Sequence, residues 1–594
     1  MANQYPLQWN LDVFYPGGSK SEAFAAELAG MENGIGKLNE LLSGNNGDPV
    51  GRLLEMTALS QEILLAFRQS ESFVACLVAQ NMKDGAAGVL NDRVKTIAAK
   101  YTSAMTKYDN MLRGVEDAAL EELLGKPEVS EIAFNLRERR EIAKQKMAPE
   151  LEALAGDLAI NGYHGWGDFY DTLVSRAQFR VEENGEQKLL SAGQMFNRLS
   201  DGDRTVRQTA FAEWEREWSS FAELGAETLN RLAGFRLKLY ENRGWDNVLR
   251  EPLQINRMSE ATLNAMWDAI EEGKTSLVAY LERKARLLGV EKLDWHDVEA
   301  PIGSSAKTVS YDEGAAFIIE QFREFDPRLA EFSEMAFKDA WIEAEDRAGK
   351  RPGGFCTAFP KSGQTRIFMT YSGTASNIST LAHELGHAYH QHVMNDKPAF
   401  AQEYAMNVAE TASTFAEMIV SDRALKATED NEEKLGLLED KIQRSVAFFM
   451  NIHARLLFET RFYEKRKQGL VSVDELNGLM EAAQREAYRD KLGEVHPYFW
   501  LSKLHFYATD VPFYNFPYTF GYLFSAGLYA KALEEGPAFA DKYVALLRDT
   551  GSMTVEELAR KHLGVDLEKA DFWRAAVALT DVDVKQFLDM TEEK

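Results

Sequence analysis

The segment His383-Glu384-Leu385-Gly386-His387 combines two imidazoles and a carboxylate at a spacing that suits metal chemistry. Four residues span slightly more than one helical turn, so His383 and His387 would lie on one face of a helix and bind a single cation. Glu384 would then lie beside that cation, where it can accept a proton from water. The pattern H-E-x-x-H is typical of zinc-binding helices, although two unrelated exposed histidines one turn apart would look the same.

A catalytic zinc normally takes three protein ligands and leaves one position open. A third histidine in the extended motif would require glycine at position 390 and histidine at position 393, but the chain has His390 and Val393. Glu403, Glu410 and Glu417 follow at seven-residue intervals in a segment that we expect to be helical, so all three would lie near one face. Their spacing alone does not select a ligand. The small residues beside Glu410 would let two helices approach closely.

The elements around the motif can also be predicted. Ser379 or Thr380 is expected to cap the start of the motif helix, which can run without a proline until Pro398. Two β-prone runs, 351–359 and 365–371, precede it and predict a small sheet. That sheet either offers an edge with which an extended peptide can pair or only anchors the helix, and the sequence leaves both roles open.

Helical periodicity dominates the rest of the chain, with apolar residues at three- and four-residue intervals over 21–42 and again over 51–113. A chain of 594 residues is too long for a single core, so we expect two or more lobes. A short hairpin across Asn184-Gly185 is the predicted edge of the first lobe. We therefore expect a mainly α fold with an N-terminal helical lobe, 1–195, and a catalytic domain, 196–594.

Composition excludes several classes of partner. The net charge of −26 and the lack of a long basic run argue against nucleic acid and against an anionic membrane surface. No stretch of eighteen apolar residues and no signal peptide is apparent. The only cysteines, Cys76 and Cys356, lie far apart in the sequence, which suits a reducing cytoplasm better than a disulfide framework.

The motif and its surroundings resemble one known family. His383 to His390, followed by Ala409-Glu410-Thr411-Ala412-Ser413, resembles the thimet oligopeptidase and oligoendopeptidase F family of zinc metallopeptidases, and most of all its bacterial oligoendopeptidase F branch. The resemblance extends to 349–355 and to 7–11, and so covers most of the chain. It implies one zinc per chain, held by His383, His387 and Glu410, with Glu384 as general base. It also implies a two-lobed helical molecule with a deep substrate channel.

An aromatic segment more than a hundred residues later completes the resemblance. Tyrosine hydroxyls need partners when buried, and near a metal they can point toward substrate. By likeness to the family, His505 and Tyr514 are the expected catalytic donors, while Tyr518 and Tyr522 are expected to bind substrate. His390 is expected to support the metal site without binding the ion.

The expected function is that of a zinc-dependent endopeptidase which hydrolyses short, unstructured oligopeptides in the cytoplasm. One alternative is a zinc carboxypeptidase on a similar helical framework, which would remove residues one by one from the C-terminus. The other is a helical peptide-binding protein that has lost catalysis. The intact ligand set and the retained Glu384 argue against the second alternative.

Overall fold

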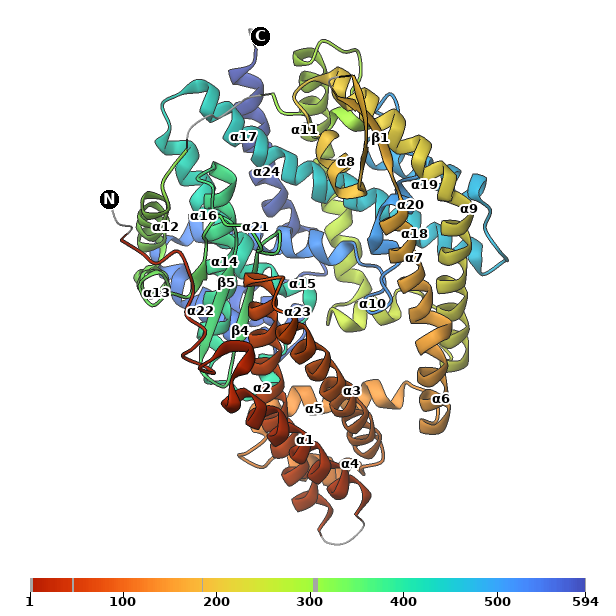
Figure 1. The fold of residues 1–594 in the computed structure, drawn as a ribbon, viewed down its shortest axis with the longest axis vertical. Coiled ribbons are helices and arrows are strands. Elements are labelled where there is room, and N and C mark those ends of the chain that lie inside the picture. Colours follow the sequence, from red (N-terminus) through yellow and green to blue (C-terminus); the bar gives the residue numbers. More distant parts are fainter. Residues whose placement is uncertain (1–3, 45–47, 184, 303–307, 593–594) are drawn as a thin grey trace. The chain divides into compact units, whose positions relative to one another are not determined.

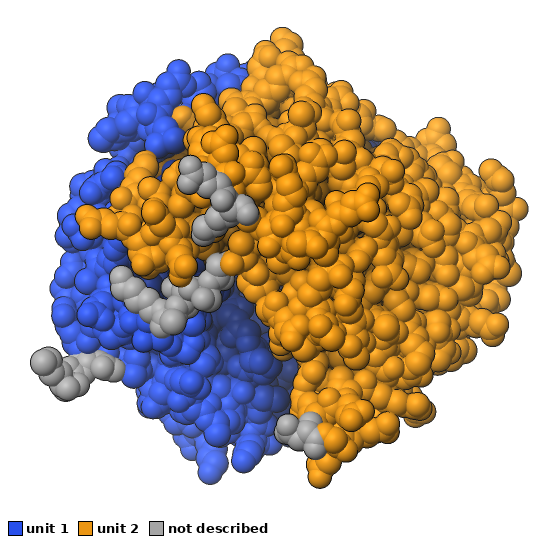
Figure 2. Space-filling view, turned by 90° about the horizontal axis from the view of Figure 1, so that it is seen from above, with its two compact units in different colours: residues 1–146, 306–423, 531–565 blue, residues 147–305, 424–530, 566–594 orange. Residues whose placement is uncertain are grey.

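The computed structural model describes residues 4–44, 48–183, 185–302 and 308–592, and the chain folds mainly into helices (Figure 1). The predicted fold class, mainly α with a small sheet next to the motif helix, is confirmed. The chain divides into two compact units, coloured separately in Figure 2. Unit 1 contains Met1–Lys146, Ala306–Arg423 and Lys531–Val565, and unit 2 contains Met147–Ser305, Ala424–Ala530 and Asp566–Lys594.

The predicted boundary at 195/196 follows the order of the chain, whereas each unit combines three separated segments. A division at that boundary into separate domains therefore stays a prediction. The hairpin expected next to it is confirmed, because β1 (Phe179–Glu183) pairs antiparallel with β2 (Glu186–Leu190). Asn184, in its predicted turn, lies outside the described residues.

Unit 1 carries the motif helix. Its helices are α1 (Glu22–Ser43), α2 (Pro49–Gln80), α3 (Gly85–Arg113), α4 (Asp117–Leu124), α5 (Ala133–Lys144), α12 (Tyr311–Phe325), α13 (Pro327–Lys338), α14 (Ala375–Met394), α15 (Met406–Ala409), the start of α16 (Thr411–Ala427), α22 (Phe539–Asp549) and α23 (Val555–Leu563). The helical run predicted over 51–113 is interrupted at Asn81–Asp84. The Asp84 carboxylate accepts hydrogen bonds from Ala86 N and Ala87 N and so begins a new helix.

A three-stranded sheet lies directly before α14 in the sequence. Its strands are β3 (Ile342–Glu343), β4 (Phe355–Phe359) and β5 (Gln364–Phe368), in the spatial order β3-β5-β4. β5 is parallel to β3 and antiparallel to β4, so β4 is an edge strand. α14 packs against β4 and β5 (Figure 1). The predicted sheet is confirmed, and its edge lies beside the motif helix.

α14 begins earlier than expected. Thr374 caps it, because its hydroxyl accepts from Asn377 N at 3.2 Å while the Asn377 side chain accepts from Thr374 N at 3.4 Å. The prediction of a cap at Ser379 or Thr380 is therefore wrong. The earlier start places His383 and His387 in the helix interior, where their backbone is held on both sides.

Unit 2 is also helical. Its helices are α6 (Pro149–Ala159), α7 (Gly165–Arg176), α8 (Ala192–Arg198), α9 (Arg204–Arg243), α10 (Arg250–Ile255), α11 (Glu260–Leu287), α17 (Asn431–Val446), α18 (Ile452–Arg466), α19 (Val473–Ala487), α20 (Phe499–Ser502), most of α21 (Phe516–Glu535) and α24 (Ala570–Met590). α11 packs along α24, and the β1–β2 hairpin lies on α9. Within the described ranges, no helix combines the length and apolar character needed to span a bilayer.

Gly386, inside the motif, allows α14 and α16 to approach very closely. A Cβ atom at this position would lie 2.6 Å from Ser413 Cα and 2.8 Å from Ala412 C, and closer still to Ala412 O. These neighbours are backbone atoms, which cannot rotate away as a side chain can. Ala412 and Ser413, two of the small residues beside Glu410 that were predicted to let two helices approach, therefore lie at this contact.

We expect Gly386→Ala to destabilise the fold by about 1–3 kcal/mol, because an added methyl group must separate the two backbones. Zinc affinity should fall as well, since the same contact positions Glu410. Thermal unfolding and a zinc titration would measure both effects. Gly436→Ala in α17 is the matched control, since a Cβ there meets nothing within 4 Å and should not destabilise the helix. Equal melting temperatures and equal zinc affinities of the two variants would contradict the expectation.

Candidate metal centre and catalytic cavity

Three predicted ligand atoms lie together in unit 1. His383 Nε2 is 3.1 Å from His387 Nε2, and Glu410 Oε2 lies 3.3 Å from the first and 3.5 Å from the second. In a tetrahedral zinc site with bonds of about 2.0–2.1 Å, neighbouring ligand atoms are about 3.3–3.4 Å apart. The triangle thus has the size that one zinc ion requires, and two histidines with one glutamate form a known catalytic ligand set.

Glu410 reaches the histidines from a turn. The single helix expected over Glu403, Glu410 and Glu417 is interrupted, because Glu410 lies between α15 and α16 with φ −82° and ψ 1°. The three glutamates therefore do not share one helical face, and that prediction is wrong. Ser413 holds the carboxylate in place, since its Oγ donates to Glu410 Oε2 at 2.8 Å.

Each histidine also has a partner on the side away from the triangle. Glu417 Oε1 lies 2.9 Å from His383 Nδ1, and a hydrogen bond joins the His387 ring to the backbone of Ala409. Carboxylates and carbonyls in such positions orient a metal-binding imidazole and raise its basicity. Glu417, which the sequence offered only as one of three possible ligands, thus becomes a candidate supporting residue.

Burial and neighbouring charges set the protonation of these groups. Burial lowers the pKa of His387, which keeps its ring neutral and able to bind a cation. Burial also lowers the pKa of His383, but the carboxylates of Glu417, Glu410 and Glu384 outweigh it and raise that pKa overall. The cluster is therefore rich in negative charge, which suits a divalent ion.

Glu384 lies beside the triangle and is only 6% exposed. Its Oε2 atom is buried and has no hydrogen-bond partner in the described part of the chain. Burial raises its pKa to about 7, although His383 opposes the shift and Glu410 supports it. A carboxyl group whose pKa lies near neutral pH can both accept and return a proton. Gly354 lies next to it, since a Cβ built on that residue would be 3.5 Å from Glu384 Oε1.

A cavity of about 510 Å³ in unit 1 contains this chemistry. One wall is α14, with His383, Glu384, His387 and Gln391, and another is the edge strand β4. Glu410 also lines it, together with residues that the sequence analysis did not select, among them Arg68, Glu71 and Ser72 on α2 and Tyr404. This volume falls in the range of small-molecule and peptide sites.

His390 does not reach the ligand triangle directly. Its Nε2 lies 2.9 Å from Thr550 Oγ1 and 3.2 Å from Leu547 O, and its ring stacks on Tyr404 at 4.3 Å. It therefore anchors α14 to α22, one turn from His387. Its predicted supporting role remains a prediction.

The predicted aromatic residues lie in unit 2. The ring of His505 is 4.9 Å from that of Tyr514 and 5.9 Å from that of Tyr518, and the two tyrosines stack at 5.1 Å. These three residues form one cluster. Tyr522 is separate, because its ring stacks on Phe448 and its hydroxyl lies 2.9 Å from Ser445 Oγ.

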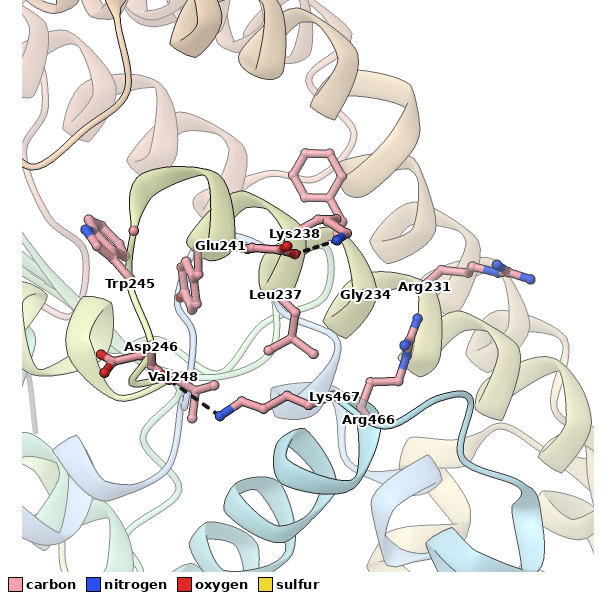
Figure 3. A pocket seen from close by; sticks show the side chains of 13 residues that line it. Arg231, Gly234, Leu237, Lys238, Glu241, Trp245, Asp246, Val248, Arg466 and Lys467 are labelled. Carbon is pink, nitrogen blue, oxygen red and sulfur yellow. Dashed lines mark hydrogen bonds and ion pairs between the residues drawn. The ribbon is translucent and has the colours of Figure 1, made fainter.

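Other clusters offer less chemistry. A cavity of about 750 Å³ between α9 and the end of α18 in unit 2 is lined by Arg231, Lys238 and Arg466, but it has no histidine (Figure 3). Lys238 is ion-paired with Glu241 there. A second set of possible metal ligands, Asp294, His296 and Glu494, is less suitable because Arg204 neutralises Asp294 at 2.8 Å.

Two known family patterns match the chain. That of peptidase family M3 matches residues 198–579, and that of oligopeptidase F matches residues 112–179. The predicted domain boundary at 195/196 falls between these matches and stays a prediction.

Curated relatives and solved structures match over nearly the whole chain. The oligoendopeptidase F homolog of Lactococcus lactis is 22% identical over 99% of this chain and 98% of its own. The group B oligopeptidase PepB of Streptococcus agalactiae is 24% identical over 96% of this chain and 94% of its own. The crystal structure of oligoendopeptidase-F from Enterococcus faecium superposes with a TM-score of 0.71 at 18% identity, covering 96% of this chain and 99% of that one. The structure of PZ peptidase A with an inhibitor superposes with a TM-score of 0.72 at 17% identity, covering 96% of this chain and 98% of that one.

We expect Glu417→Gln to weaken zinc binding about 10–100-fold, because the amide no longer supplies a negative charge to His383 Nδ1. Competition with a chromophoric chelator would measure the affinity. Glu429→Gln, at an exposed position after α16, is the control and should bind zinc as the unaltered chain does. Equal affinities in both variants would rule out the supporting role of Glu417.

His505 should stay neutral at pH 6. Burial, together with Arg455 and Lys503, lowers its pKa to about 4, so between about pH 4 and 6.5 the ring is neutral in the folded chain, whereas in the unfolded chain it binds a second proton. Stability contributed by this group therefore falls as pH drops through that window. NMR of histidine-labelled protein, with His505→Asn for assignment, would report the titration. A midpoint near 6.5 would contradict the burial argument.

Proposed function

The chain belongs to peptidase family M3, and on that premise we propose that it is a zinc-dependent oligoendopeptidase which hydrolyses short, unstructured peptides. The observation that carries the proposal is the triangle of His383, His387 and Glu410 with buried Glu384 beside it in one cavity. The names of the relatives, which are oligoendopeptidases and oligopeptidases, support the same substrate class. The free thiols of Cys76 and Cys356 support the cytoplasm as its compartment.

Zinc fits the donor set of two neutral imidazoles and one carboxylate, which His383, His387 and Glu410 would supply. When bound, zinc would supply Lewis acidity toward the peptide carbonyl and lower the pKa of the attacking water toward about 7. Glu417 and Ser413 would orient two of the ligands through the contacts described above. The protein's part is to keep these donors fixed in place.

Glu384 is the proposed general base. Its Oε2, which has no hydrogen-bond partner among the described residues, would accept a proton from the attacking water and pass it to the leaving amine.

His505 and Tyr514 are the proposed donors to the oxyanion of the tetrahedral intermediate, each worth about 3 kcal/mol of transition-state stabilisation. Neutral His505 can donate from a ring N–H, and its Nδ1 atom is buried without a hydrogen-bond partner among the described residues. Tyr518 and Tyr522 are proposed to contact substrate. Tyr518 lies in the same cluster as His505, whereas the Tyr522 hydroxyl would first have to leave Ser445.

The edge strand β4 is the proposed docking site for the peptide backbone. Its residues line the cavity that contains Glu384, and an extended peptide can pair with a free strand edge through main-chain hydrogen bonds. Such pairing recognises the backbone of the peptide and not its side chains. It therefore suits an enzyme that cleaves short peptides of varied sequence.

Digestion of a mixed peptide library should yield internal cuts, and a chelator should abolish them. Glu384→Gln should keep zinc but reduce turnover by several orders of magnitude, because the proton acceptor is lost. Mass spectrometry reads the products, and Glu429→Gln serves as the active control. Stepwise loss of C-terminal residues would instead indicate a carboxypeptidase, and a zinc-free, inactive chain would indicate a peptide-binding protein.

A further inference from the structure

The catalytic cavity has a cationic side chain on α2 that the proposed mechanism does not use. Arg68, Glu71 and Ser72 line the cavity together with His383, Glu384 and His387. Ser72 is committed to β4, since its Oγ donates to Ala358 O at 2.6 Å. Arg68 is the remaining strongly polar group whose purpose the fold does not explain.

A network built on the metal-binding helix positions Arg68. Its Nη2 donates to Gln391 Oε1 at 3.2 Å. Gln391 Nε2 in turn donates to Gln402 Oε1 at 3.0 Å and to Asn395 Oδ1 at 3.1 Å, which fixes the amide. Gln391 follows His387 by four residues, so the guanidinium is anchored about 6 Å along α14 from a metal ligand.

No ion pair neutralises the charge of Arg68 in the part of the chain that the structure describes. Its Nη1 atom is buried and has no hydrogen-bond partner, and across the described ranges Arg68 takes part in no ion pair. Glu71, one turn further on α2, lines the same cavity; burial raises its pKa and the nearby charge of Arg68 opposes that shift, but the two side chains form no ion pair within the described ranges. A guanidinium remains charged at any physiological pH, and a buried unpaired donor is costly. A ligand that brings a carboxylate would remove that cost.

We propose that Arg68 determines specificity by binding a carboxylate of the peptide substrate, an inference that rests on the proposed peptidase function. The carboxylate is either the peptide's C-terminus or an aspartate or glutamate side chain, and the guanidinium can bind both in bidentate fashion. An extended peptide advances about 3.3 Å per residue, so the anchor about 6 Å from His387 corresponds to about two residues from the cleaved bond. The enzyme would thus prefer peptides with a negative charge at that distance.

Two pairs of peptides separate the sources of the carboxylate. In the first pair, a peptide that ends two residues after the cut carries a free C-terminus or an amide. In the second pair, both peptides are amidated and carry aspartate or asparagine at that position. We expect the unaltered enzyme to show a kcat/KM about 10–100-fold higher for the charged member of at least one pair, as one charge-assisted hydrogen bond allows.

In Arg68→Gln the ratio between charged and neutral peptides should fall to about one. Arg68→Lys should retain part of the preference, because it keeps the charge but loses the planar fork. Arg93→Gln, which removes an exposed arginine of α3, is the matched control and should retain the full ratio. Zinc content and the melting temperature show whether each variant is folded.

A binding measurement gives a second readout that does not depend on turnover. In the Glu384→Gln background, calorimetry should show tighter binding of the charged peptide, and Arg68→Gln should remove the difference.

A preference confined to the first pair identifies the C-terminal carboxylate, and one confined to the second identifies the side chain. No preference in the unaltered enzyme, or a preference that survives Arg68→Gln, overturns the proposal. Failure to cleave any peptide would instead overturn the proposed peptidase function.

Discussion

The contact between the backbones of α14 and α16 at Gly386 is the constraint on which the metal centre depends. Two histidines on one helix supply only two ligands. Glu410, the proposed third ligand, and Glu417, the proposed support of His383, come from the neighbouring segment and reach the imidazoles because no side chain separates the helices. The glycine in the middle of the motif thus serves the geometry of the site, although it carries no reactive atom.

Local features of the site were predictable, and contacts between distant segments were not. The spacing of His383 and His387 follows from the helical period, and β-prone residues predicted the strands before α14. Helical periodicity could not show the turn at Glu410, because small and polar residues there suit helix and turn equally. The capping residue Thr374 was missed because Ser379 and Thr380 offered equivalent caps nearer the motif. Arg68 has no local signal, since α2 reaches the cavity only through tertiary packing.

The charges of the cavity explain why a metal ion belongs there. Glu384, Glu410 and Glu417 surround two imidazoles, and their mutual repulsion contributes to the raised pKa of Glu384. A divalent cation offsets that repulsion. Carboxylates that repel one another without the cation therefore contribute to the affinity of the site for it. Arg68 on α2 lines the same cavity with the opposite charge, and in our proposal it serves recognition while the ligand triangle serves chemistry.

Unit 1 is assembled from three stretches of chain, and its last stretch, Lys531–Val565, includes the α22 residues that hold His390. A ribosome that adds about 5–20 residues per second therefore finishes the motif helix well before the segment that braces it. The peptidase completes its catalytic unit only when synthesis is nearly over.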